Sequence, residues 1–324
     1  MIIQIDGHTR ALPDFLIVGA PRSATSSLYG SLEGSPGVFM SRVKEPMFFY
    51  AWDRPPIFID AALRKPADFF IVRPEEYFRL FKTAGPDDLI GEASTWYLRD
   101  FETTIPKIRR IYGPDARRVK IVIVLRNPID RAWSHYWLKK AHGEENLPFA
   151  EAVQADIVAG RLRQNVSPAF DYLGQGLYAP SIQAFRESFD GVKIFLFEDV
   201  QKRPKETAAD LTEFLGLPRT AALPAPKHWN ASGVPRGPAT AWAARRLYLP
   251  NAFKAVLKLF LPFHFRQNLK YRAAGRLFVQ PKMAPDFRRS LRPFFEDDIR
   301  RLETMIGRDL GAWLRDPAPG NATE

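Results

Sequence analysis

The stretch Phe15–Leu32, FLIVGAPRSATSSLYGSL, constrains the fold more than any other part of this chain. It begins with a short apolar run rich in strand-forming residues, turns at Gly19 and continues into a segment typical of a helix. A strand, a tight loop and a helix in this order gather backbone N–H groups and the positive end of a helix dipole around one point. The stretch therefore predicts a phosphate-binding loop in an α/β fold.

The loop differs from that of a nucleoside triphosphatase. Such an enzyme would carry G-x-x-x-x-G-K-[ST], whereas here Gly19 is followed by four residues and then Ala24 and Thr25. The lysine is missing, and Arg22 offers a permanent charge with planar donors earlier in the loop. An ordinary strand–turn–helix with a polar cap is the alternative for this loop alone. The other loop residues expected to line an anion are Ser23, Ala24, Thr25, Ser26 and Ser27.

Alternating strand and helix patterns continue along the chain. We expect strands over Asp14–Val18, Leu89–Ala93, Lys120–Leu125 and Val192–Phe197, and helices over Thr25–Leu32 and Thr103–Tyr112, the second broken early by Pro106. This alternation predicts an α/β fold with a central parallel sheet flanked by helices. We expect residues 1–324 to form a single P-loop-like domain.

Composition limits the kinds of partner and the cellular compartment that we expect for this chain. The net charge of +11 predicts anionic partners. The absence of cysteine excludes disulfides, thiolate metal sites and cysteine nucleophiles, and is compatible with a reducing cytosol. The N-terminal residues do not resemble a signal peptide, and no run reaches the ~18 apolar residues of a membrane span. We therefore expect a cytoplasmic protein, and no metal site because the five histidines are dispersed.

The positive charge is concentrated in the C-terminal third. Residues 214–285 contain no acidic side chain, and we expect them to form a helical and loop elaboration of the domain. Residues 240–278 are basic and aromatic, which favours a helical cap on the core but also fits peripheral contact with an anionic membrane. Two proline-rich stretches, Asp53–Pro74 and Gly216–Pro238, are expected to be long surface loops.

A second element supports the anion site. In KIVIVLRNPIDRAWSHYW, Arg126 follows a clear strand, and Ser134 lies eight residues later on the next expected helix. Ligands of parallel α/β sheets bind at the carboxyl ends of the strands. Arg126 and Ser134 are therefore expected to converge on a second phosphate.

These motifs together resemble a known family. PRSATSS after a strand, then KEPMFF, then VLRNPIDRAWSHY is similar to the sulfotransferases that use 3′-phosphoadenosine 5′-phosphosulfate, in particular the heparan sulfate branch and its bacterial relatives. The resemblance continues through GLYAPSIQAFRESF, IFLFEDVQKRP and LRPFFEDDIRRLETMIGRDLGAW, and so extends from Asp14 to Trp313.

The resemblance implies roles for the donor-binding residues. The first loop would hold the 5′-phosphosulfate, with Arg22 at the position where many members carry a catalytic lysine. Arg126 and Ser134 would hold the 3′-phosphate. Ala24 departs from the glycine usual in the family, and Lys282 occupies the approximate place of a C-terminal cofactor loop.

The resemblance also implies a catalytic scheme without a metal. Glu45 of the KEPMFF segment would be the general base, with Glu92 as the reserve candidate. Arg22 and Lys44 would stabilise charge on the leaving adenosine 3′,5′-bisphosphate, since arginine is too weak an acid to donate a proton. The alternative for Glu45 is a salt bridge to the cations of the site.

The sequence therefore predicts a sulfotransferase that moves a sulfuryl group in line to a hydroxyl or amine of a glycan, lipid or small metabolite. Two alternatives remain: a P-loop kinase or nucleoside triphosphatase, and a nonenzymatic polyanion-binding protein. No nucleic-acid motif is present, and nucleic acid is not expected as a partner. Nothing in the sequence indicates the acceptor or the oligomeric state.

Overall fold

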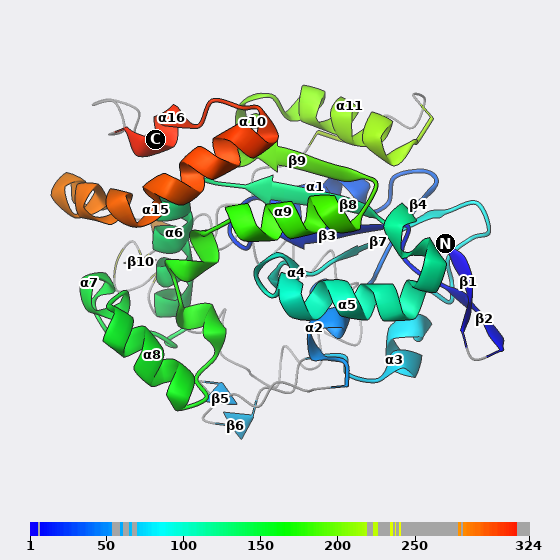
Figure 1. Ribbon diagram of the computed structural model, residues 1–324, viewed down its shortest axis with the longest axis horizontal. Helices are drawn as coiled ribbons and strands as arrows, with labels where there is room; N and C mark the ends of the chain where they lie inside the picture. Colours follow the sequence, from blue (N-terminus) through cyan, green and yellow to red (C-terminus); the bar gives the residue numbers. More distant parts are fainter. Residues whose placement is uncertain are drawn as a thin grey trace.

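A five-stranded parallel sheet forms the centre of the fold (Figure 1). The strand order is β4-β7-β3-β8-β9, which confirms the predicted α/β architecture. Strand β3 begins one residue later than expected, and β9 ends one residue earlier because Phe197 starts helix α10. In order across the sheet the strands are β4 (Val38–Met40), β7 (Leu89–Ala93), β3 (Phe15–Gly19), β8 (Lys120–Leu125) and β9 (Val192–Leu196).

The structure, a computed structural model, describes residues 1–5, 7–53, 70–218, 223–225 and 281–315, with short pieces at 59–60, 65–66, 234–235, 237, 240 and 278–279. Most of the two proline-rich loops lies outside the described residues, as does almost all of the basic segment 240–278. Among the helices described, none has the length and apolar character needed to cross a bilayer.

Both faces of the sheet are buried because its strands are apolar at nearly every position. Leu16, Val18 and Ile121 belong to one core cluster, and Phe15 and Ile17 belong to the cluster on the opposite face. Figure 1 shows α5 and α9 in front of the sheet. Among the helices that bury side chains in the first cluster are α5 (Phe101–Tyr112), α6 (Pro128–Ala141), α9 (Ala179–Ser188) and α15 (Pro285–Ile306), and among those in the second are α1 (Thr25–Leu32) and α11 (Pro204–Leu215).

Shorter elements complete the described fold. The strands form three two-stranded antiparallel pairs: β1 (Ile2–Ile5) with β2 (His8–Ala11), β5 (Ile59–Asp60) with β6 (Lys65–Pro66), and β10 (Val234–Pro235) with β11 (Phe278–Val279). The short helices are α2 (Phe48–Ala51), α3 (Pro74–Arg79), α4 (Trp96–Arg99), α7 (Phe149–Ala152), α8 (Ala155–Arg163), α10 (Phe197–Lys202) and α16 (Gly311–Leu314), with 3₁₀ turns at Gly113–Arg118, Pro168–Phe170 and Gly174–Gly176.

Helix α5 corrects one sequence prediction. We expected Pro106 to break the helix, but α5 begins at Phe101 and continues through the proline to Tyr112. A proline removes one helical hydrogen bond and crowds the preceding turn. The helix nevertheless buries Ile105, Ile108 and Ile111 on its inner face, and this burial offsets the local cost.

The carboxyl ends of four neighbouring strands meet at one edge of the sheet. The segments that leave this edge carry Arg22 after β3, Arg126 after β8, Thr95 after β7 and Glu45 after β4. The sheet therefore brings together residues that are up to about a hundred positions apart in sequence, as parallel α/β sheets do.

Candidate active site

The loop after β3 has the geometry of an anion cradle. Arg22 and Ala24 both have left-handed backbone conformations, with φ of 69° and 68°. Helix α1 starts directly after Ala24 and has no side-chain cap, so its first N–H groups face the loop. The loop is fitted closely against α4, because a Cβ at Gly19 would lie 2.5 Å from Cβ of Leu98. This close approach explains the glycine at the end of β3.

Arg22 is hydrogen-bonded to both Arg126 and Ser134, the pair expected to hold a second phosphate, and their role in binding stays a prediction. Nε of Arg22 donates a hydrogen bond to Oγ of Ser134 over 3.1 Å. Nη1 of Arg126 donates to the carbonyl oxygen of Arg22 over 3.1 Å. Three residues from β3, β8 and α6 therefore form one connected group, with two guanidinium groups and a hydroxyl at the same edge of the sheet.

Arg126 is held in a setting that suits an anionic ligand. Its guanidinium lies 4.3 Å from the ring centre of Phe197, and its carbonyl oxygen accepts a hydrogen bond from the Tyr178 hydroxyl. Burial lowers the pKa of Arg126 below its usual value. No carboxylate of the described residues lies within ion-pair distance of Arg126. Asp130 and Glu198 act on its charge without forming an ion pair with it in the described residues, so the guanidinium can still bind an anion from outside the protein.

Helix α6 positions Ser134. The side chain of Asn127 caps the helix by accepting hydrogen bonds from the backbone N–H groups of Ile129 and Asp130, at 3.0 and 3.3 Å. Pro128 occupies the first helical position, where its missing N–H costs nothing. The rigid start of this helix fixes the direction of Ser134 two turns later.

Arg131 and His135 lie inside the protein beneath this face of α6. Arg131 is fully buried and its Nη1 lies 3.4 Å from Nδ1 of His135, while its Nε has no hydrogen-bond partner in the part of the chain that the structure describes. Burial and the neighbouring Arg131 hold the pKa of His135 well below its usual range. His135 is therefore a neutral interior residue, and Arg131 adds positive potential beneath the donor site.

Glu45 is clamped by the segment that follows β7. Its Oε2 accepts hydrogen bonds from the backbone N–H of Thr95 at 2.7 Å and from the Thr95 hydroxyl at 3.2 Å. The backbone N–H of Glu45 donates to the carbonyl of Ala93 at 2.9 Å. Glu45 has a φ of 63°, so these bonds stabilise a conformation that is uncommon for its residue type. The carboxylate is 28% exposed and is accessible from solvent.

Lys44 lies against Glu45 and forms an ion pair with its second carboxylate oxygen at 2.5 Å. The salt bridge considered as the alternative for Glu45 is therefore present, and its partner is the neighbouring lysine. A carboxylate oxygen has more than one lone-pair direction, so an ion-paired Glu45 can still accept a proton. The ion pair and a base role are compatible in this geometry.

Glu92, the reserve candidate, is located in the core. It is fully buried on β7, and its Oε2 accepts hydrogen bonds from the hydroxyls of Tyr77 at 2.9 Å and Tyr97 at 3.1 Å. Burial raises the pKa of Glu92 to about 7, against the opposing effect of these hydrogen bonds and of Ser94. Glu92 thus has no exposed surface to offer an acceptor.

The donor loop fits the phosphosulfate that the resemblance implies. Ser23 is fully buried within the loop, and among the described residues its hydroxyl has no hydrogen-bond partner. A buried hydroxyl without a partner is costly unless a ligand satisfies it. Thr25 and Ser27 are also buried, while Ser26 is half-buried at the helix start. An orphan donor, two arginines and an uncapped helix together match a highly charged anion.

Lys282 lies at the surface, and its role stays a prediction. The carbonyl of the preceding Pro281 accepts a hydrogen bond of 2.6 Å from Nε1 of Trp133, which ties this segment to α6 next to Ser134. In the part of the chain that the structure describes, no group of three or more potential ligands is arranged to hold a metal ion.

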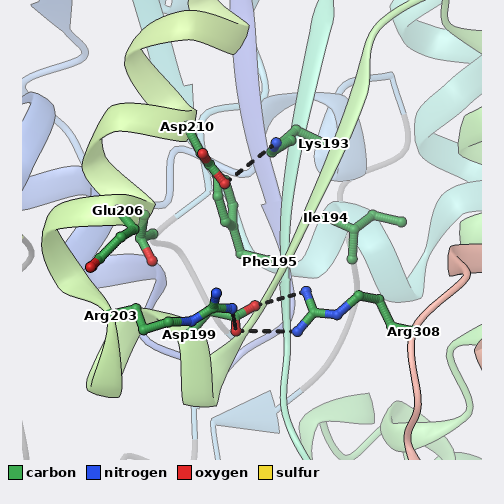
Figure 2. Close-up of a pocket in the computed structure, with 9 residues that line it drawn as sticks. Lys193, Ile194, Phe195, Asp199, Arg203, Glu206, Asp210 and Arg308 are labelled. Atoms are coloured by element: carbon green, nitrogen blue, oxygen red, sulfur yellow. Dashed lines mark hydrogen bonds and ion pairs between the residues drawn. The ribbon is translucent and has the colours of Figure 1, made fainter.

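Two hollows elsewhere have a different character. The first, of about 90 Å³, lies beside β9, where Asp199 binds both Arg203 and Arg308 (Figure 2). Its lining contains three basic and three acidic side chains, whose charges cancel. These residues come from β9, α10, α11 and the chain after α15. The second, of about 510 Å³, is at the amino-terminal edge of the sheet and includes Asp14, Asp87 and Asp88. Neither suits an anionic donor.

Sequence reasoning missed three residues of the site: Thr95, Arg131 and Phe197. Thr95 had a usable signal, because it follows a predicted strand just as Arg126 does. Arg131 lies within a motif that we had singled out, but its burial depends on how α6 packs. Phe197 follows the last strand, and only the assembled sheet brings it against Arg126.

Comparisons with known proteins agree with this geometry. A family profile for the sulfotransferase domain matches residues 111–232. A crystal structure of a sulfotransferase from Alicyclobacillus acidocaldarius is 28% identical, with a TM-score of 0.68, and the match covers 94% of this chain and 100% of that one. The human bifunctional heparan sulfate N-deacetylase/N-sulfotransferase 2 is 24% identical over 322 residues, covering 94% of this chain.

A shorter match is to the membrane-associated sulfotransferase kil1 of Dictyostelium discoideum. The two proteins are 25% identical over 143 residues, which cover 43% of this chain. The chain spans only part of the length of these relatives. The match covers 31% of the human protein and 26% of the Dictyostelium protein.

Proposed function

We propose that this chain is a sulfotransferase, like the proteins it matches, and that it transfers a sulfuryl group from 3′-phosphoadenosine 5′-phosphosulfate to a hydroxyl or amine of an acceptor. The observation that carries the proposal is the connected group of Arg22, Arg126 and Ser134 at the carboxyl edge of the sheet. This group offers separate cations for the two ends of a doubly phosphorylated nucleotide. The amine acceptor named for the human relative is carried over here only as one of the two options.

The residues divide the donor between them. Arg126 and Ser134 hold the 3′-phosphate, with Phe197 and Tyr178 fixing Arg126. The loop Ser23–Ser27, whose N–H groups and hydroxyls lie around the start of α1, holds the 5′-phosphosulfate. The hydroxyl of Ser23 gains a partner in this arrangement, which removes the cost of leaving it buried and unbonded.

The proposed transfer forms one bond to sulfur and breaks another. A lone pair of the acceptor oxygen or nitrogen forms a bond to sulfur while the bond from sulfur to the bridging phosphate oxygen breaks. The bond's electron pair goes to that oxygen and leaves adenosine 3′,5′-bisphosphate. Arg22 stabilises the charge that develops there, because a fixed cation in a dry site acts without reorganising water.

Glu45 takes the proton that the acceptor loses. Its two hydrogen bonds from Thr95 and its ion pair with Lys44 hold the carboxylate in one orientation at the edge of the donor site. We therefore assign Lys44 the role of orienting Glu45, so its effect on the leaving group is indirect. Fixed orientation of a base accounts for much of its catalytic value.

Thermal unfolding with added adenosine 3′,5′-bisphosphate tests the donor site. The compound binds only the folded protein and should therefore raise the melting temperature. At a concentration one hundred times its Kd, it adds about 2.7 kcal/mol to the free energy of unfolding. Arg126→Ala should remove most of this shift, and Ser134→Ala should reduce it by less because it removes one neutral donor.

Arg109→Ala is the matched control, since Arg109 also bonds a serine, Ser188 at 3.0 Å, but lies away from the site. It should leave the shift intact. A shift in the Arg126→Ala protein equal to that of the wild type would show that Arg126 does not hold a phosphate. A shift with ATP but none with the bisphosphate would instead favour a kinase or nucleoside triphosphatase.

A further inference from the structure

Helix α16 contacts the segments that leave β8 and β9 at their carboxyl ends. Its Trp313 is buried, with 4% of its surface exposed. The indole Nε1–H donates a hydrogen bond of 3.2 Å to Oε1 of Glu198, and the Trp313 carbonyl oxygen accepts one of 3.0 Å from Nδ2 of Asn127. The ring also meets that of Tyr178 edge to face, with ring centres 6.5 Å apart. One residue therefore contacts α10, the start of α6 and the chain before α9.

Strands β8 and β9 bring Arg126 and Glu198 to the same edge of the sheet. Leu125 pairs with Leu196 at the end of the two strands. Arg126 directly follows the first of these residues, and Glu198 lies two positions after the second. The Arg126 guanidinium is 4.3 Å from the ring centre of Phe197, the residue before Glu198. A cationic and an anionic side chain thus leave neighbouring strands close together.

Glu198 is bonded to Trp313 rather than to Arg126. The described residues show no ion pair between Arg126 and Glu198, and Oε2 of Glu198 is buried without a hydrogen-bond partner among them. Burial raises the pKa of Glu198, while the hydrogen bond from Trp313 and the charge of Arg126 act in the opposite direction. The indole N–H and the guanidinium therefore stabilise the same carboxylate. Loss of the indole bond would leave that carboxylate with more to gain from pairing with Arg126.

Two further contacts hold Trp313 in place. Its backbone N–H donates a hydrogen bond of 2.8 Å to the carbonyl of Leu310. Arg308, in the chain between α15 and α16, donates two hydrogen bonds to Asp199 over 3.0 and 3.2 Å (Figure 2). Asp199 directly follows Glu198, so neighbouring residues of α10 bind this C-terminal segment at two points.

We propose that Trp313 is a positioning residue of the donor site, whose indole N–H keeps Glu198 from pairing with Arg126 and so leaves the guanidinium to the 3′-phosphate. The inference rests on the proposed function and concerns how that site selects its donor. A carboxylate paired with Arg126 would occupy the donors that the phosphate needs and would repel its negative charge. Trp313 acts through Glu198, and its effect is selectivity for a nucleotide with a 3′-phosphate.

The readout is the preference for a 3′-phosphate, measured without turnover. Calorimetry on the full chain gives the Kd of adenosine 3′,5′-bisphosphate and that of adenosine 5′-monophosphate, the weaker ligand being measured by displacement. The two nucleotides differ only in the 3′-phosphate, so the ratio of their Kd values reports the contacts to that group. Trp313→Phe keeps a ring beside Tyr178 but loses the N–H donor. It should lower the preference by about tenfold, the order expected for one hydrogen bond to a charged group.

A second substitution separates positioning from packing. Glu198→Gln removes the competing charge and should keep at least the preference of the wild type. The double variant with Trp313→Phe should recover the preference of Glu198→Gln alone, whereas a packing defect at Trp313 would not be repaired by an amide at the other position. Glu198→Asp breaks the same bond from its other end, because the shorter side chain keeps the charge but loses the indole. It should lower the preference as well, and it serves where Trp313→Phe does not fold.

Three results would overturn the proposal: an unchanged preference in folded Trp313→Phe, an unchanged preference in Glu198→Asp, or a double variant that stays as low as Trp313→Phe. Phe189→Leu is the matched control. Phe189 is a buried aromatic residue packed against Phe185, at the opposite end of α9 from Tyr178. This variant should lower the melting temperature and leave the preference unchanged.

The wild-type protein keeps the two proposals separate. Equal affinity of the wild type for the two nucleotides, or no binding of the bisphosphate, refutes the donor site of the proposed function itself. A wild type that prefers the bisphosphate, with variants of Trp313 that keep this preference, refutes only the positioning role of Trp313.

Discussion

Burial of Glu92 predicts a specific dependence of stability on pH. The carboxyl is fully buried between the hydroxyls of Tyr77 and Tyr97, and burial raises its pKa from 4.5 to about 7. The folded protein therefore binds this proton more tightly than the unfolded chain does. The contribution of Glu92 to stability is greatest below pH 4.5, decreases as the pH rises through the folded-state pKa, and is constant above it.

The size of the effect follows from the pKa change. Each pKa unit corresponds to about 1.4 kcal/mol, so this carboxyl alone should lower the free energy of unfolding by about 2 to 3 kcal/mol between about pH 5 and pH 8. For a chain of 324 residues, this corresponds to about 4 °C in melting temperature, with an unfolding entropy of about 2 cal/mol/K per residue.

Glu92→Gln isolates this contribution, because its amide oxygen can still accept from the two tyrosines but cannot ionise. The melting temperature of the variant minus that of the wild type should rise by about 4 °C from about pH 5 to pH 8. Other titrating groups cancel in this difference, and Glu102→Gln on the exposed side of α5 controls for loss of one negative charge. A difference that stays constant with pH would refute the reasoning.

Two further predictions concern the donor loop and the base. Ala24→Gly should stabilise the protein by about 0.5–1 kcal/mol, measured by urea unfolding. Ala24 has a left-handed backbone conformation, in which glycine carries no Cβ penalty. A loss of stability would show that Ala24 is not strained. Glu45→Gln should keep the thermal shift with adenosine 3′,5′-bisphosphate but lose about 10²–10⁴-fold in turnover on an acceptor, whereas Arg22→Ala should lose both. Full turnover of Glu45→Gln across the pH range would place the base elsewhere.

The sequence predicted the parts of the fold that depend on local patterns. Four strands and the helix Thr25–Leu32 were placed within one residue of their observed bounds, because β-branched runs and a glycine at the turn are strong local signals. The sheet rule predicted that Arg126 and Ser134 would converge on one phosphate, and the structure connects each of them to Arg22. Helix α5 was harder, since the penalty of Pro106 is local and the burial that offsets it comes from tertiary packing.

The remaining features of the site depend on contacts between distant segments. Thr95 and Glu45 are fifty positions apart, and no local pattern pairs a threonine with a glutamate across that distance. The environment of Glu92 is set by tyrosines from α3 and α4, so its burial could not be predicted from GEAST alone. The ring contacts among Tyr50, Phe70 and Trp96 likewise need three separate segments to be assembled.

The two halves of the site are built on different strands, and this explains why binding and chemistry should be separable by mutation. The donor cations belong to β3, β8 and the start of α6, and they are connected by the bonds among Arg22, Arg126 and Ser134. The proposed base, Glu45, belongs to the segment after β4, which is joined to the segment after β7 through Thr95. Under the proposed function, changes on the second side should alter proton transfer and leave the contacts to the 3′-phosphate in place. A mutation that removes Thr95 should therefore act on turnover before it acts on donor affinity.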